Sequence, residues 1–309
     1  MKAIRSLNRR TFLSAGAQAT VAVCFTATSL TARESKARSF VIEAGEVRGL
    51  AVNAQGELAV AADNGILFYG ADGLLERKVA AGRPVRAVHF DAHGRLFIAC
   101  KDQVARLRAD GTLDLLGAPL GGREPALTSL AIADNGDLYA ADSGERLVWR
   151  LDATGKILGR IQPSENGFSV PRSFFPIAWR SGELLVADPG RHQIQTYTPD
   201  GKLVAKWGGR SRDPAGFTGC CNPVSLVTLA DGTVVTAERG QPRVKAFSAE
   251  GRFARELAGP EEFTASVAAA RADTEELSGC QAGLFDVAAS PDGRVVVLDR
   301  TTREIRVLA

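Results

Sequence analysis

The sequence is poor in the residues and motifs from which familiar enzyme sites are built. Its 309 residues include three histidines, and their positions (89, 93 and 192) do not favour a three-histidine zinc site. A Gly-x-Ser-x-Gly elbow, a His-Glu-x-x-His helix and a phosphate-binding glycine loop are all missing, which excludes the commonest signatures of serine hydrolases, zinc peptidases and nucleotide-binding proteins. The five cysteines form no Cys-x-x-Cys pair. Sequence motifs therefore assign no catalytic residue.

The chain also lacks a dominant charge and an internal run of strongly apolar residues. Its formal net charge is +3, but residues 1–32 contribute four basic residues and no acidic ones. Of the 38 basic residues, 34 then remain against 35 acidic ones, so the net charge becomes −1. This balance gives no electrostatic reason to expect nucleic acid or an anionic membrane as a partner. No run of about 20 strongly apolar residues follows residue 32, so no membrane span is predicted after signal removal.

The N-terminal residues have the features of an export signal. Asn-Arg-Arg-Thr-Phe-Leu-Ser at residues 8–14 precedes a mildly apolar run that ends at Leu30. The arginine pair resembles the twin-arginine translocation signal, and Leu30-Thr31-Ala32 is a plausible cleavage site. We expect a signal peptide at 1–32, a linker at 33–38 and a periplasmic location. A general secretory signal with a chance arginine pair is the alternative.

The sequence does contain a repeat. Six segments share a turn glycine, an apolar strand and, in all but the second, a final acid: residues 56–63, 94–100, 136–142, 182–188, 232–238 and 293–299. The six leading glycines are spaced by 38, 42, 46, 50 and 61 residues. Short strands repeating at about 40–50 residues indicate a β-propeller, because one such unit cannot bury its own apolar face.

The repeat predicts an all-β, six-bladed propeller over residues 39–309. Each repeat supplies four strands; in the fourth they are expected at 174–178, 183–188, 193–198 and 203–207. The last repeat has room for only three strands before Ala309. Ser39–Ala44 can supply the fourth, and this N-terminal strand would close the last blade and remove exposed sheet edges.

Two segments carry a resemblance to a known family. Asp142–Gly155 and Asp188–Gly201 resemble NHL repeats, in which an acid, a polar turn, an alternating strand and an Asp-Gly hairpin follow one another. The resemblance covers nearly all of the chain after residue 32 and is strongest in repeats three to five. It implies a six-bladed propeller with a binding face. It does not imply one activity, because related propellers include scaffolds, amidating lyases and lactonase-like hydrolases.

Four cysteines are expected on one face of the propeller. Cys100 ends a second strand, Cys220 and Cys221 lie in the link between blades four and five, and Cys280 lies in the next link. Three interpretations stay open: a disulfide from Cys280 to Cys220 or Cys221, a thiolate site for a soft metal or an iron–sulfur cluster, and a redox-active thiol pair.

The acids that end the second strands point toward the same face. Asp142, Asp188, Glu238 and Asp299, with His192 and Asn222, are the candidates for a ligand-binding face. A ring of carboxylates is suited to Ca²⁺, as in lactonase-like propellers. Alternatively, the acids cap turns by accepting hydrogen bonds from backbone N–H groups and arginines.

These observations favour a binding or accessory protein, linked through its cysteines to redox or metal chemistry. The expected partner is a protein or a small molecule on the face that carries the long links, 159–173, 208–223 and 259–283. The alternative is an enzyme, a metal-dependent lactonase-like hydrolase or lyase.

Overall fold

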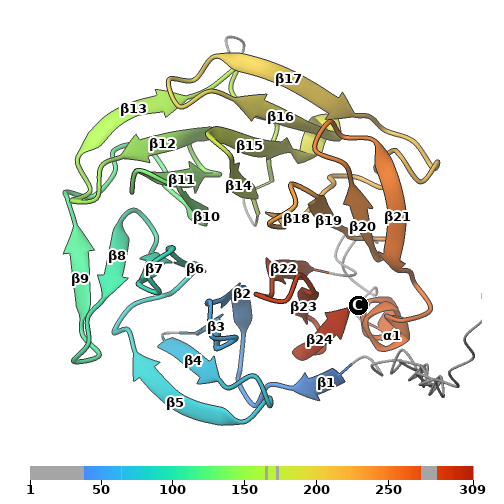
Figure 1. Ribbon diagram of the computed structural model, residues 1–309, viewed down its shortest axis with the longest axis horizontal. Helices are drawn as coiled ribbons and strands as arrows, with labels where there is room; N and C mark the ends of the chain where they lie inside the picture. Colours follow the sequence, from blue (N-terminus) through green and yellow to red (C-terminus); the bar gives the residue numbers. More distant parts are fainter. Residues whose placement is uncertain (1–37, 64, 164–165, 172–173, 273–283, 309) are drawn as a thin grey trace, which may run out of the picture. The chain divides into compact units, whose positions relative to one another are not determined.

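Six four-stranded antiparallel sheets surround a common axis (Figure 1). They belong to a computed structural model that describes residues 38–63, 65–163, 166–171, 174–272 and 284–308. Each sheet is one blade of a β-propeller, and the inner strands of successive blades pack against one another around the axis, β22 meeting β2 to complete the ring. The predicted all-β, six-bladed fold is confirmed.

Each blade runs from its inner strand outward along the chain. Blade 1 is β2 (Val47–Val52), β3 (Leu58–Ala62), β4 (Gly65–Tyr69) and β5 (Leu75–Ala80); blade 2 is β6 (Ala87–Phe90), β7 (Leu96–Ala99), β8 (Val104–Leu107) and β9 (Leu113–Leu116). Blade 3 is β10 (Leu127–Ile132), β11 (Leu138–Asp142), β12 (Leu147–Leu151) and β13 (Ile157–Ile161); blade 4 is β14 (Ile177–Arg180), β15 (Glu183–Asp188), β16 (Gln193–Tyr197) and β17 (Leu203–Gly208). Blade 5 is β18 (Ser225–Thr228), β19 (Val234–Glu238), β20 (Arg243–Phe247) and β21 (Phe253–Ala258); blade 6 is β22 (Phe285–Ala289), β23 (Val295–Asp299), β24 (Glu304–Leu308) and β1 (Arg38–Val41).

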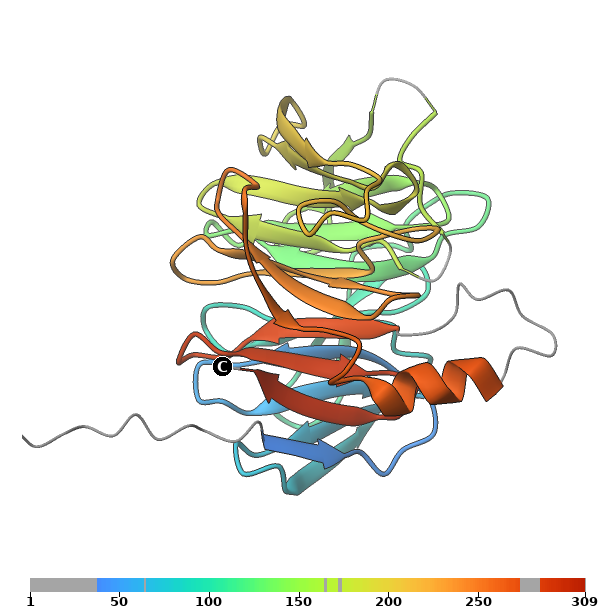
Figure 2. The same cartoon turned by 90° about the vertical axis from the view of Figure 1, so that its right-hand side faces the viewer.

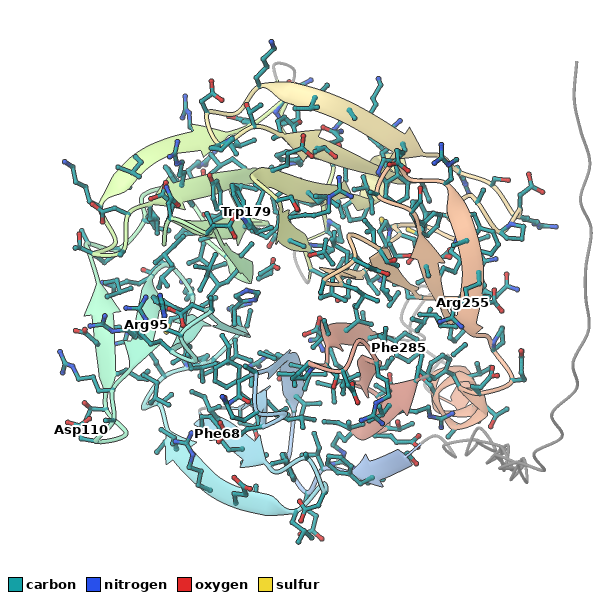
Figure 3. The ribbon with its side chains drawn as sticks, in the orientation of Figure 1. Phe68, Arg95, Asp110, Trp179, Arg255 and Phe285 are labelled. Atoms are coloured by element: carbon teal, nitrogen blue, oxygen red, sulfur yellow. The ribbon has the colours of Figure 1, made fainter. Side chains whose placement is uncertain are left out.

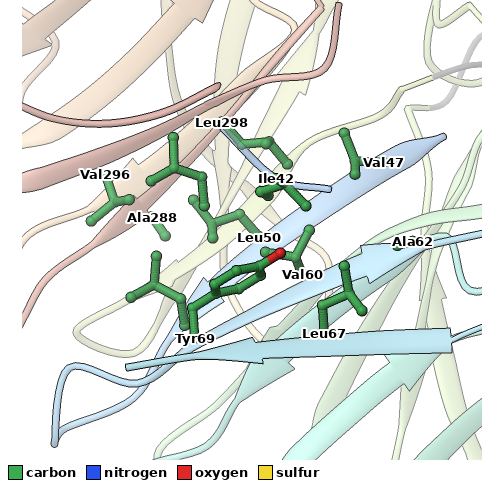
Figure 4. Packing of buried hydrophobic residues seen from close by; sticks show 12 residues of the cluster. Ile42, Val47, Leu50, Val60, Ala62, Leu67, Tyr69, Ala288, Val296 and Leu298 are labelled. Carbon is green, nitrogen blue, oxygen red and sulfur yellow. The ribbon is translucent and has the colours of Figure 1, made fainter. Parts of the chain in front are cut away.

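The N-terminal strand closes the ring as the sequence predicted. β1 pairs antiparallel with β24, with Phe40 opposite Ile305. The ring of Phe40 lies 5.4 Å from that of Tyr69 in blade 1. Behind this strand, Ile42, Val47 and other blade 1 residues pack against Val296 and Leu298 of blade 6 (Figure 4). The first and last parts of the propeller chain are therefore joined by both a sheet and an apolar core.

The repeated glycines are required by the turns. All six leading glycines have a positive φ, namely Gly56, Gly94, Gly136, Gly182, Gly232 and Gly293, with values between 74° and 86°. Side chains with a Cβ rarely adopt this conformation, so the glycine fixes the hairpin between the first and second strands. At the first of these turns the Asn53 carboxamide oxygen also accepts hydrogen bonds from the backbone N–H groups of Gln55 and Glu57.

The burial of the strands explains their sequences. The second strands are the most buried. Every position of β3, β11, β19 and β23 is buried. Outer strands such as β5 and β17 are largely exposed, and β5 carries three consecutive charged residues, Glu76, Arg77 and Lys78. Six apolar clusters fill the gaps between the six pairs of neighbouring blades, so each blade is packed on both faces.

One predicted strand is displaced. The inner strand expected at 174–178 begins instead at Ile177. Pro176 has no N–H to donate, so it stands before the strand, where its carbonyl accepts a hydrogen bond from Ala187. Phe174 and Phe175 are buried ahead of the strand.

In the described part of the chain, two short helices accompany the sheets. They are η1 (Pro189–Arg191) and α1 (Thr264–Ala272), and α1 lies beside blade 6 (Figure 2). The Phe263 ring, just before α1, packs 4.6 Å from that of Phe285. Neither of these helices has the length and hydropathy needed to cross a membrane, within the residues described.

Deleting Ser39–Ala44 should abolish soluble, folded protein. The deletion removes most of β1, leaves β24 as an open edge and removes the contact between Phe40 and Tyr69. Thermal unfolding and size-exclusion chromatography measure the effect, with a form that starts at Arg33 as the control. Closure by β1 is refuted if the deletion variant melts at the same temperature as the control.

Candidate functional site: the axial cavity

The inner strands enclose a cavity of about 670 Å³ on the propeller axis. Residues of all six inner strands line it. We call the end at which the inner strands begin the connection face, since the links between blades and the turns between second and third strands lie there. The cavity is within the size range of sites that hold small organic molecules.

Charged side chains gather where the cavity meets the connection face. Glu46 and Arg48 come from the start of β2, Arg86 directly precedes β6, Asp286 is near the start of β22, and Arg300 directly follows β23. Three guanidinium groups thus share one end of the cavity with two carboxyl groups. Charges gathered in a partly enclosed space exert a strong electrostatic field on any ligand that enters.

Asp286 joins three blades at this end. Its carboxylate accepts hydrogen bonds from the Leu50 backbone N–H of blade 1 at 2.7 Å and from the Ser225 hydroxyl of blade 5 at 2.6 Å. Burial raises the pKa of Asp286, although these hydrogen bonds and Arg300 act in the opposite direction. The side chain is therefore a structural tie between blades as well as part of the cavity wall.

The three arginines differ in how their charge is balanced. Arg48 makes an ion pair with Glu46 at 2.5 Å. Arg300 donates from Nε to the Val47 carbonyl at 3.1 Å, and burial lowers its pKa while Asp286 and Glu46 raise it. Arg86 makes no ion pair in the described part of the chain, and its Nε is buried there without a hydrogen-bond partner. Arg86 is the guanidinium whose charge is least compensated.

The opposite end of the cavity is less charged. Trp179 stacks on Tyr139 at 5.4 Å, and its indole N–H donates to Asp134 at 3.1 Å. Trp179 lies nearer the axis than Arg255 of the outer strand β21 (Figure 3). His89 also lines the cavity, and burial lowers its pKa to about 4, so its imidazole is neutral at pH 7.

The acids expected to form a ligand-binding face are hydrogen-bonded within the blades. Asp142 is fully buried and accepts from the backbone N–H groups of Ala126, Gly144 and Glu145. Asp188 accepts from the Ser169 N–H and from Arg191. None of the six residues Asp142, Asp188, His192, Asn222, Glu238 and Asp299, all of them described, lines the axial cavity.

The other members of that set have similar local partners. Asp299 accepts from the N–H groups of Thr301 and Thr302. His192 has a φ of 56°, and its Nε2 lies 3.1 Å from the Gly219 carbonyl oxygen. Within the described residues, no three side chains of His, Cys, Asp and Glu come together as a metal site.

Glu238 belongs to a fully buried ionic cluster that anchors the link between blades 4 and 5. Its carboxylate contacts Lys245 at 2.6 Å and Arg243 at 3.0 Å, and it accepts from the Thr218 N–H at 2.9 Å. Lys245 also donates to the carbonyls of Pro214 and Gly216. Burial lowers the pKa of Lys245, which Glu238 opposes. The link is thus held by an ion pair inside blade 5.

The cysteines fall into two places. Cys100 follows β7 and is buried in the apolar cluster between blades 1 and 2. Cys220 and Cys221 lie in the link from blade 4 to blade 5, with their sulfur atoms 3.6 Å apart. Cys221 packs against the cluster of Phe174, Val224 and their neighbours. Cys280 lies outside the described residues.

One sequence pattern locates charged residues of the cavity, although the search for repeats did not use it. Arg48 and Arg86 each stand eight residues before a repeat glycine, a position that falls at the start of an inner strand. Charged residues at such positions point to a polar axis. Arg300 and Asp286 are harder to find, because their meeting depends on pairing across β22 and β23.

Comparison with known proteins establishes the fold and nothing narrower. No family model matches the sequence, and no curated protein matches it significantly. Among solved structures, gluconolactonase XC5397 of Xanthomonas campestris superposes with a TM-score of 0.65 at 18% identity, covering 92% of this chain and 94% of its own. Virginiamycin B lyase of Staphylococcus aureus superposes with a TM-score of 0.60 at 13% identity, and the match covers 89% of this chain and 99% of the lyase. A chain of the mitotic checkpoint complex superposes with a TM-score of 0.57 at 14% identity, and the match covers 98% of this chain and 99% of that one. Propellers of such different roles share this architecture.

Replacing Lys245 by Met should destabilise the protein by about 3 kcal/mol, because Glu238 then keeps its buried charge with one partner fewer. Urea unfolding measures the change. Lys202→Met, at an exposed position, serves as the control and should unfold like the unaltered protein. Equal stability of the two variants would show that the buried ion pair does not anchor the link.

Proposed function

We propose that this protein is a binding protein that holds a small anionic molecule in the axial cavity, entered from the connection face. The observation that carries the proposal is Arg86, a guanidinium at the cavity wall without an ion pair in the described chain. A buried or half-buried cation of this kind costs free energy unless an anion balances it. A carboxylate or phosphate group of a ligand would supply that balance.

The remainder of the cavity supports the same proposal. A neutral His89 offers hydrogen bonding at the far end, and Trp179 offers apolar contact there. The rigid inner strands around them place these groups without a cost in loop ordering. A ligand with an anionic head and a partly apolar body fits both ends.

We further propose that the protein works in the periplasm after export, as an NHL-type propeller. The support is the sequence of residues 1–32, with Arg9 and Arg10 ahead of an apolar run. These residues lie outside the described part of the structure. A near-neutral propeller of the expected size is compatible with this route.

The enzymatic alternative, a metal-dependent lactonase-like hydrolase or lyase, has weaker support. The comparisons with a gluconolactonase and a virginiamycin B lyase concern the fold, at 18% and 13% identity. In the ranges described, the acids that a metal would need are engaged with backbone groups, as for Asp142 and Asp188. No specific observation therefore favours that chemistry over binding.

Thermal-shift screening with small carboxylates and phosphates, each beside a neutral analogue, tests the binding proposal. An anionic compound should raise the melting temperature, and its neutral analogue should not. Arg86→Gln should weaken binding of that compound by about ten- to a hundredfold, as expected for loss of a charged hydrogen bond. Arg255→Gln, on the exposed outer strand β21, should leave it unchanged. Equal affinity of the Arg86→Gln variant would contradict the proposal.

Replacing Arg9 and Arg10 together by Lys should block export, since the twin-arginine route reads the guanidinium pair and charge alone does not suffice. Cell fractionation with immunodetection measures the distribution. Replacement of Lys2 and Arg5 is the matched control and should leave export largely intact. Normal periplasmic delivery of the double-lysine variant would indicate general secretion instead.

A further inference from the structure

We propose that Cys220 and Cys221 form a thiol–disulfide exchange site for disulfide-containing partners that approach the connection face. Their sulfur atoms lie 3.6 Å apart. Cys220 is exposed and Cys221 is half-buried. A partner can thus reach one sulfur while the second is already in contact with the first. The site is separate from the axial cavity and does not depend on the cavity having a ligand.

The residues on both sides of the pair are held firmly. Before it, Gly219 has a φ of 78°, and its carbonyl oxygen contacts the His192 ring. After it, Asn222 is fully buried and donates from its backbone N–H to the Pro189 carbonyl at 3.1 Å. The Asn222 side chain exchanges two further hydrogen bonds with the backbone of Arg239. The link therefore presents the two thiols from a fixed frame.

Arg239 also places a positive charge beside the inner thiol. Its guanidinium lies 4.9 Å from the centre of the Phe174 ring and interacts with Cys221. Burial and the neighbouring Cys220 raise the pKa of Cys221, and Arg239 opposes this effect. The exposed Cys220 is consequently the attacking sulfur, and Cys221 is the resolving one.

The exchange proceeds in two balanced steps. The Cys220 thiolate attacks one sulfur of a partner disulfide, forming a mixed disulfide and releasing one partner thiolate. Cys221 then loses its proton and attacks the Cys220 sulfur, forming the Cys220–Cys221 bond and releasing the second partner thiolate. The protein dithiol is oxidised by two electrons, and the partner disulfide is reduced to two thiols.

The geometry of adjacent cysteines suits a reversible bond better than a permanent one. Neighbouring Cα atoms are about 3.8 Å apart, whereas relaxed disulfides span roughly 4.4–6.8 Å. A bond between them is strained and therefore easily reduced. A shared metal ion would need further donors, and among the described residues no third His, Cys, Asp or Glu completes a group.

The test uses purified full-length protein carrying Cys280→Ser, reduced and then exposed to glutathione disulfide. Intact-mass analysis and peptide mapping should find a Cys220–Cys221 bond that reopens in a reduced glutathione buffer. With Cys221→Ser added, glutathione should accumulate on Cys220. With Cys220→Ser added, glutathione incorporation at this link should fall by about tenfold or more, as expected for loss of the exposed attacking thiol. Cys100→Ala, remote from the link, should leave the exchange unchanged.

Two results would overturn the proposal. One is equal glutathione incorporation with and without Cys220. The other is a disulfide from Cys280 to Cys220 or Cys221, found in protein that keeps Cys280 and resistant to the reduced glutathione buffer. Such a bond would be a structural bridge. Melting temperatures of all variants show whether each remains folded.

Discussion

Every blade depends on having a neighbour on both of its faces. Second strands such as β3 and β23 are buried along their whole length, which no isolated four-stranded sheet could achieve. The six apolar clusters each join two consecutive blades, and the cluster around Ile42 and Leu298 joins the last to the first. Closure of the ring is thus the condition on which the other five interfaces rest, and β1 provides it.

Closure also creates the cavity. Six twisted sheets arranged around an axis leave a space that their inner strands cannot fill, and the chain places polar groups there. Asp286 shows how these groups serve the fold, since it bonds to Leu50 and Ser225 in the two adjacent blades. Ser129 and Thr228 make similar bonds between neighbouring blades. Asp286, Ser129 and Thr228 thus have hydrogen-bond partners in neighbouring blades. Arg86 differs, because its Nε is buried without a hydrogen-bond partner among the described residues, and ligand binding is proposed on it.

The sequence predicts this fold well because its signals are local. Each repeat glycine is required by a positive φ, and each apolar strand by burial between blades, so both can be read from a single repeat. The inner strand of blade 4 was misplaced because Pro176 shifts the start of pairing while the hydrophobic pattern of Phe174 and Phe175 continues. The start of this strand therefore depends on the missing N–H group of Pro176, and a hydrophobic pattern does not indicate such a group.

The site is less predictable, because the partner of a polar side chain comes from a distant part of the chain. The sequence allowed either a cation site or turn capping for Asp142; the contacts with Ala126 and Gly144 depend on how a link folds back over the blade. Arg86 could be located at the start of an inner strand from its spacing, but its lack of an ion pair among the described residues required coordinates. The hydrogen bonds by which Asn222 holds the cysteine link were not expected for the same reason, because their partner is the backbone of Arg239, 17 residues away.

The link between blades 4 and 5 connects the two proposals physically. The Glu238–Lys245 pair fixes its first half through Gly216 and Thr218, and Asn222 fixes its end. Cys221, between these anchors, packs in the same cluster as Phe174 and Val224, and both of these residues also line the cavity. Because protein interiors are close-packed, the residues of this cluster are the first to be affected by a change in the bonding of Cys221. The cysteine pair and the axial cavity are therefore separate sites that share one apolar cluster.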